Sequence, residues 1–219
     1  MKTAAERIVL IPCYRPGRNL SRLVIRLNEM NIRVILINDG SGTEYDAIFR
    51  NLSIFAVVLD HKEQLGKCSA LITGLEYINA QYIRSDNCKP EQSSARNLSF
   101  AADLEVYNSS DPDGYSPQRI ESLLSRVEDS PRQLLVNIKK NRSGSLFHRL
   151  RPGKRLTGFY NGLWAFDGSM TDIILTAAAG TDNTESDILT ALRHNKVSIR
   201  EITLSDRASS FTAGRYCYR

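Results

Sequence analysis

The sequence predicts an α/β fold, with a mostly parallel central sheet and helices on both of its faces. Continuous apolar runs at 7–14, 32–39 and 133–140 are typical of strands that are buried on both sides. Segments with apolar residues at helical spacing follow several of these runs, which indicates strands and helices alternating along the chain. With 219 residues, 42% of them hydrophobic, the chain is long enough for one domain with a core of its own.

The first half should begin with a strand over 7–14, because this apolar run stops at Pro16 and Gly17. A helix should follow over 20–30, where Leu20, Val24 and Leu27 form one apolar stripe. The next elements are expected from their apolar patterns: strands over 32–39 and 53–60, a helix over 67–79, and a fourth strand over 102–108. The polar segment between the last two, 84–97, is predicted to be a loop or insertion.

The second half should open with a helix over 116–129, since Ser116 is a good helix cap and Pro117 suits the first helical position. The remaining elements are then expected in this order: strands over 133–140 and 162–168, helices over 170–179 and 185–195, and a last strand over 197–204. Without an internal repeat or linker, we expect one domain over 1–204 and an irregular tail over 205–219.

The charge pattern favours an anionic partner. The net charge is +5, and the segment 132–155 holds eight Lys or Arg and no Asp or Glu. Such a segment could contact a phosphate or an anionic membrane surface, or it could simply be a solvated face. Aromatic residues are not interleaved with these cations, so nucleic acid is not an expected partner.

The cysteines and the apolar runs bear on the expected compartment. The four cysteines at 13, 68, 88 and 217 lack the C-x-x-C spacing of a zinc site and are expected to be free thiols in a reducing cytoplasm. Residues 1–17 do not resemble a signal peptide, and no apolar run reaches the 18 or so residues that span a bilayer. A cytoplasmic protein, with peripheral contact at the inner membrane face, is the expectation.

Four polar loops follow predicted strands, at 12–19, 38–44, 60–67 and 108–116. In open parallel sheets ligands bind beyond the carboxyl ends of the strands, so these loops are the candidate site. Neither a dinucleotide-binding G-x-G-x-x-G nor a P-loop is present.

Three of these loops carry residues with suitable chemistry. Asn38 and Asp39 precede a Gly-Ser-Gly turn and could accept hydrogen bonds from a base or ribose, although Asp-Gly is also an ordinary turn. Lys67 opens a helix whose first amides favour an anion, although it is equally compatible with a plain helix start. Asp111 and Asp113 could converge on Mg2+ or Mn2+, or could belong to a simple turn.

In this order the loops resemble those of the family 2 glycosyltransferases with a GT-A fold, and most of all the polyprenyl-phosphate sugar transferases of the dolichol-phosphate mannose synthase type. The resemblance rests on these segments: "VLIPCYRPGRNLSRLV", "ILINDGSG", "LGKCSALITGLEY", "DLEVYNSSDPDGYSPQRIESLL", "GLWAFDGSM" and "ESDILTALRHNKVSIREITL". Together they span roughly residues 7–204.

The resemblance implies a metal-dependent inverting transferase that moves a hexose from a nucleotide-diphosphate sugar to a polyprenyl phosphate or to a saccharide or lipid hydroxyl. It also implies the site residues: Pro12, Tyr14, Asn38, Asp39, Lys67, Asp111 and Arg142 for the nucleotide sugar, Asp111 and Asp113 for Mg2+ or Mn2+, and Asp113, Glu185 and Asp187 for catalysis.

The sequence departs from the family pattern at several places. Asn38 stands where the family usually has Asp, and Lys139, Lys140 and Arg142 replace its G-S-R motif. Two alternatives therefore stay open: a nucleotidyltransferase that forms sugar nucleotides, and a non-catalytic member that binds them. His61 is expected to be an exposed loop residue, and Trp164 a core residue.

Overall fold

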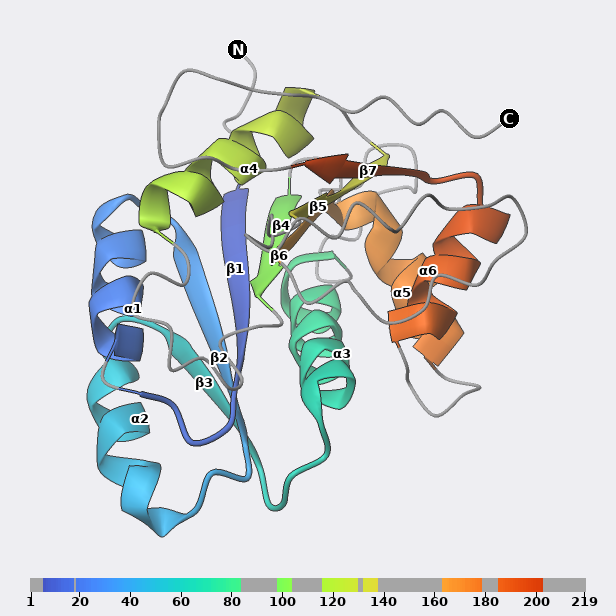
Figure 1. Cartoon of the computed structure of the whole chain (residues 1–219). Helices are drawn as coiled ribbons and strands as arrows, with labels where there is room; N and C mark the ends of the chain where they lie inside the picture. Colours follow the sequence, from blue (N-terminus) through green and yellow to red (C-terminus); the bar gives the residue numbers. More distant parts are fainter. Residues whose placement is uncertain are drawn as a thin grey trace, which may run out of the picture.

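The computed structural model describes most of the predicted elements as one layered α/β structure (Figure 1). The described residues are 6–17, 19–83, 98–103, 116–129, 132–137, 163–178 and 185–202. Its strands are β1 (Glu6–Cys13), β2 (Arg33–Asp39), β3 (Val57–His61), β4 (Leu98–Asp103), β5 (Gln133–Asn137), β6 (Leu163–Asp167) and β7 (Ser198–Ile202). Its α-helices are α1 (Asn19–Glu29), α2 (Asp46–Leu52), α3 (Lys67–Ile78), α4 (Pro117–Asp129), α5 (Thr171–Ala178) and α6 (Glu185–His194).

The strands form a sheet in the order β3-β2-β1-β4-β6-β5-β7. The neighbours β3, β2, β1 and β4 are parallel, and so are β5 and β7. Only β6 among these strands runs in the opposite direction, antiparallel to both β4 and β5. The predicted fold class, a mostly parallel sheet within an α/β domain, is therefore confirmed.

Helices cover both faces of the sheet, and each face has its own buried core (Figure 1). Residues of α3, α5 and α6 pack on one face, where Trp164 is fully buried as predicted. Residues of α1, α2 and α4 pack on the other face. Because strand side chains alternate between faces, consecutive residues at a strand end belong to different halves of the molecule.

The start of α4 matches its sequence signals. The Ser116 hydroxyl accepts a hydrogen bond from the Arg119 N–H at 3.3 Å, and Pro117 is the first helical residue. Farther along the helix, Glu128 accepts a hydrogen bond from Arg7 Nε at 2.8 Å, which raises the pKa of the Arg7 guanidinium above its usual value. This contact ties the start of β1 to α4.

Two elements differ from the sequence expectation. The third strand is shorter than predicted, because residues 46–52 form α2 and a turn follows in which Leu52 accepts from the N–H groups of Phe55 and Ala56. The fourth strand covers 98–103 instead of 102–108, since these residues pair with Glu6–Leu10 of β1 on one side and with β6 on the other. A local helix and turn thus set the start of the third strand, and long-range pairing set the bounds of the fourth.

Several expectations lie outside the described residues: the loop 84–97, the segment 104–108, most of the basic segment 132–155, and the tail 205–219. Within the described part of the chain, no helix is long and apolar enough to cross a membrane.

Two isoleucines at opposite extremes of exposure test this packing. We expect Ile35→Ala to lower the free energy of unfolding by about 2–5 kcal/mol, because Ile35 is fully buried in the core next to α3. The same substitution at Ile54, whose exposed fraction is 79%, should change it by no more than about 0.5 kcal/mol. Urea unfolding of both variants measures the difference, and equal losses would contradict the described packing.

Candidate functional site

The candidate site lies where the parallel strands end. β1 ends at Cys13, β2 at Asp39 and β3 at His61, and the described part of β4 ends at Asp103. These residues share one edge of the sheet because the four strands are parallel. The segments that follow β1, β2 and β3 lead into α1, η1 (Thr43–Tyr45) and α3 respectively.

Asp39 is fully buried, and its carboxylate is surrounded by donors from the segment that follows β3. Oδ1 accepts from the Leu65 N–H at 2.8 Å, and Oδ2 accepts from the Gly66 N–H at 2.9 Å. His61 Nδ1 lies 2.7 Å from Oδ1. An ionised carboxylate is stable in a buried position only with such donors, so Asp39 fixes the path of residues 61–66.

His61 is not the exposed loop residue that the sequence suggested. It is the last residue of β3, paired in register with Asp39, and its side chain is only 8% exposed. Its second nitrogen, Nε2, lies 2.9 Å from the Thr73 hydroxyl on α3. The expectation was wrong because β3 continues one residue farther than predicted, which turns this side chain toward α3.

Asn38 makes a second set of contacts, on the opposite face of β2. Its Nδ2 donates to Asp60 Oδ1 at 2.9 Å, and its Oδ1 accepts from the Ser41 N–H at 3.1 Å. This geometry explains why an amide suits position 38: an aspartate there would face the Asp60 carboxylate without a donor between them. Asp60 is exposed, so its carboxylate, which Asn38 orients, can accept hydrogen bonds at the edge of the site.

Ser41 connects the loops that follow β1 and β2. Its buried hydroxyl accepts from the Arg15 N–H at 3.0 Å. Arg15 has a φ of 49°, unusual for a residue with a side chain, and its guanidinium lies over the Tyr14 ring at 5.1 Å. The two side chains that follow β1 are thus held together at the same edge.

Gly40 lets the β2 loop touch the β3 loop. Its φ is 66°, and a Cβ at this position would lie 2.4 Å from the backbone carbonyl carbon of Glu63. No other residue type combines this backbone conformation with such a close approach. The three loops therefore form one connected rim, joined by Arg15–Ser41, Asn38–Asp60 and Gly40–Glu63.

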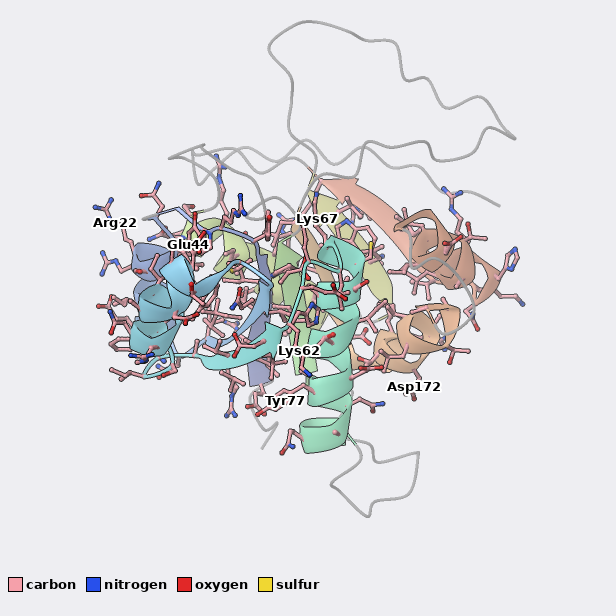
Figure 2. The ribbon with its side chains drawn as sticks, turned by 90° about the horizontal axis from the view of Figure 1, so that it is seen from below. Arg22, Glu44, Lys62, Lys67, Tyr77 and Asp172 are labelled. Atoms are coloured by element: carbon pink, nitrogen blue, oxygen red, sulfur yellow. The ribbon has the colours of Figure 1, made fainter. Side chains whose placement is uncertain are left out.

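Lys67 begins α3 directly after this rim (Figure 2). The first backbone hydrogen bond of the helix runs from the Ala70 N–H to the Gly66 carbonyl, so the amides before Ala70 point out of the start of the helix. Lys67 is half-buried, and no ion pair involves it within the described residues. Outward amides, the helix dipole and a cation together suit a phosphate.

Pro12 and Asp103 mark the boundary between β1 and β4. The β1–β4 pairing ends at Leu10 and Ala102, whereas β1 stays paired with β2 as far as Cys13. Pro12 is buried and has no N–H to donate, which suits a place where the β4 ladder has stopped. Asp103 follows at the end of the described β4 and opposite Leu163 of β6.

The other predicted site residues lie on α6 or outside the described part of the chain. Asp111, Asp113 and Arg142 lie outside the described residues. Glu185 is the first residue of α6, and Asp187 is half-buried in its first turn. In the part of the chain that the structure describes, no group of three or more His, Cys, Asp or Glu side chains could hold a metal ion.

Sequence reasoning missed Ser41, Asp60 and His61 in the rim, Thr73 on α3, and the edge position of Asp103. The register that pairs Asn38 with Asp60 and Asp39 with His61 reveals two of these residues, and sequence patterns do not give register. For Asp103 a signal was present: the mostly apolar run 98–102, which ends at Asp103, could have been read as the strand itself.

A charge swap tests the Asn38–Asp60 contact. We expect Asn38→Asp to lower the free energy of unfolding by about 1–2 kcal/mol at neutral pH, because a hydrogen bond is replaced by two facing carboxylates. The loss should shrink in acid, because protonation of one facing carboxylate removes the repulsion. Adding Asp60→Asn should recover most of the stability by restoring the donor, and chemical unfolding of both variants against pH would show whether it does.

A pair of glycines tests the close approach in the rim. Gly40→Ala should lower the free energy of unfolding by about 2 kcal/mol or more, because both its φ and its space exclude a Cβ. Gly17→Ala is the matched control, since a Cβ there meets nothing within 4 Å. If the two variants melt at the same temperature, the loops after β2 and β3 are not in the contact described.

Comparisons with known proteins agree with this architecture. Residues 8–84, from β1 through α3, match the family described as Glycosyl transferase family 2. No match was found among curated proteins.

Solved structures share the fold at low sequence identity. S. aureus TarS 1-349 is 14% identical, with a TM-score of 0.50 over 93% of this chain and 59% of its own. The same protein in complex with UDP is also 14% identical, with a TM-score of 0.50 over 92% of this chain and 59% of its own. GalNAc-T7 with UDP, GalNAc and Mn2+ is 12% identical, with a TM-score of 0.51 over 90% of this chain and 42% of its own.

The chain thus spans less than two thirds of the length of the solved structures that it matches. The matched segment contains the whole rim described above, from the loop after β1 to the start of α3. The match over residues 8–84 agrees with the family 2 glycosyltransferase resemblance predicted from the sequence, and the solved structures show that the chain shares their fold.

Proposed function

We propose that the protein is a metal-dependent inverting glycosyltransferase, which transfers a hexose from a nucleotide-diphosphate sugar to an acceptor. The observation that carries this proposal is the connected rim at the carboxyl edge, with Lys67 and the first turn of α3 beside it. The family match over the same residues and the UDP in two of the similar solved structures support it.

The rim divides into two parts with different chemistry. Pro12, Tyr14 and Asn38 lie around the ends of β1 and β2, where hydrogen-bonding groups and a ring suit the nucleoside. Lys67 and the amides of the first turn of α3 suit the diphosphate, whose charge they would offset. The carboxylate of Asp39 is fully buried and accepts hydrogen bonds from Leu65 and Gly66. Asp39 therefore acts on the nucleotide sugar indirectly, by fixing the segment 61–66.

The metal is assigned to Asp111 and Asp113, which come after β4 in the sequence. Carboxylate oxygens are the ligands that Mg2+ and Mn2+ prefer, and two of them with donor phosphates make a common site. The fit is supported by β4 itself, which delivers Asp103 to the carboxyl edge and so makes Asp103 a further candidate. When bound, the metal would neutralise charge on the departing nucleoside diphosphate.

The chemistry assigned to the protein side chains follows from inversion. The acceptor attacks the anomeric carbon from the face opposite the nucleoside diphosphate, and that bond breaks as the new one forms. A hydroxyl acceptor needs a general base, for which Asp113, Glu185 and Asp187 are the candidates, whereas a phosphate acceptor already carries its charge. Asp187 lies in the first turn of α6, which packs against α5.

The acceptor is assigned to the basic segment 132–155. A polyprenyl phosphate at a cytoplasmic membrane face, or a saccharide or lipid hydroxyl, would meet Arg142 and its neighbouring cations there. The transferase domain is taken to extend over 1–204, with 205–219 as a tail.

Nucleotide binding provides the first test. The melting temperature should rise by several degrees with UDP or GDP plus Mn2+, and less with EDTA, because only the folded state binds the nucleotide. Asp113→Ala should remove the metal-dependent part of this rise. Parallel measurement of Asp103→Asn shows which of the two aspartates the metal-dependent rise requires. Asp172→Ala, an exposed acid on α5, is the matched control and should respond like the unmodified protein.

The proposal is contradicted if neither nucleotide raises the melting temperature with any divalent metal. Release of pyrophosphate from a nucleoside triphosphate and a sugar 1-phosphate would identify a nucleotidyltransferase instead. Binding of a donor without turnover across many acceptors would identify a non-catalytic member.

A further inference from the structure

The inference concerns His61, which links the end of β2 to the middle of α3. One ring nitrogen contacts the buried carboxylate of Asp39 at 2.7 Å, and the other contacts the hydroxyl of Thr73 at 2.9 Å. An ionised carboxylate only accepts hydrogen bonds, so Nδ1 carries the proton. Nε2 then accepts from Thr73 in the neutral ring or donates to it in the charged ring, so both contacts exist in either state.

Through Asp39 the same unit also holds the start of α3. Asp39 Oδ2 binds the N–H of Gly66, the residue immediately before Lys67. Helix α3 is therefore fixed at two levels: at Gly66, the residue before its first turn, through Asp39, and more than one turn later through Thr73. Two fixed points define both the position of a helix along its axis and its rotation about that axis.

This unit is separate from the contacts around Asn38. Ile37 and Leu59 belong to the core beneath α3, whereas Leu36 and Val58 belong to the opposite core. By the alternation of strand side chains, Asp39 and His61 continue the first set, and Asn38 and Asp60 continue the second. A change at His61 should consequently disturb the start of α3 and leave the contacts of Asn38 in place.

We propose that His61 is a positioning residue for the donor diphosphate: with Asp39 it holds Lys67 and the first amides of α3 in the place where the second phosphate binds. The proposal rests on the proposed function, because it assigns the start of α3 to the diphosphate of that donor. It predicts that His61 affects the affinity gained from the second phosphate and not the affinity for the nucleoside.

Two substitutions at His61 separate its two contacts. In His61→Asn the amide nitrogen lies near the place of Nδ1, so the contact with Asp39 is kept. In His61→Gln the amide reaches toward the place of Nε2, so the contact with Thr73 is kept and that with Asp39 is lost. Both variants have neutral polar side chains, and they differ mainly in which contact remains.

The measurement is the ratio of UDP affinity to UMP affinity, and of GDP affinity to GMP affinity, by titration calorimetry with Mn2+ and again with EDTA. His61→Gln should lower the diphosphate-to-monophosphate ratio by roughly tenfold in both conditions, because the buried carboxylate loses a donor and the start of α3 shifts. His61→Asn should retain most of the ratio. Monophosphate affinity should stay within about twofold throughout.

Two controls keep the outcome clear. His194→Gln changes an exposed histidine at the end of α6 and should leave the ratio unchanged. Thr73→Val keeps the shape of Thr73 without its hydroxyl, and should lower the ratio less than His61→Gln does. If the histidine variants do not fold, Thr73→Val still tests the contact between His61 and α3.

Equal ratios in His61→Gln, Thr73→Val and the unmodified protein would overturn the inference while leaving the proposed function intact. An equal loss of monophosphate and diphosphate affinity would overturn it as well, since it would show a general structural effect. If the unmodified protein binds none of the four nucleotides, the proposed function itself is contradicted, and the inference is overturned with it.

Discussion

The buried carboxylate of Asp39 is the constraint on which the site depends. It lies at the end of β2 with no exposed surface, in a place where an ionised group is stable only if the protein surrounds it with donors. Those donors come from His61, the last residue of β3, and from Leu65 and Gly66 in the short segment that follows it. Satisfying one charge therefore fixes the course of that segment and the place where α3 begins.

Alternation along two paired strands gives the edge two separate functions. Asp39 and His61 face α3 and act on the helix, whereas Asn38 and Asp60 face the other core and act on the loop that precedes η1. Neighbouring residues in the sequence thus serve different parts of the proposed donor site. This arrangement also explains the amide at position 38, because Asp60 already supplies the carboxylate of that pair.

The sequence was sufficient for the fold class and for most of the elements that form the sheet edge. Buried strands read as continuous apolar runs, Ser116 and Pro117 marked the start of α4, and the polar loops after the strands marked the edge. It was not sufficient for the residues that organise this edge. The contacts of Asp39 with His61, and of Asn38 with Asp60, join residues 22 positions apart, and only strand register brings them together. The fourth strand was predicted at the wrong position for the same reason, since pairing with β1 and β6 defines its bounds, Leu98–Asp103.

Hydrogen exchange, followed residue by residue as a nucleoside diphosphate and Mn2+ are added, tests the central claim most directly. The account predicts new protection of the amides in the first turn of α3 and in the loops 14–17 and 40–42. It also predicts little change at Leu65 and Gly66, whose amides already bind Asp39. Protection confined to α5 and α6, with the first turn of α3 unchanged, would contradict the claim that this edge binds the donor.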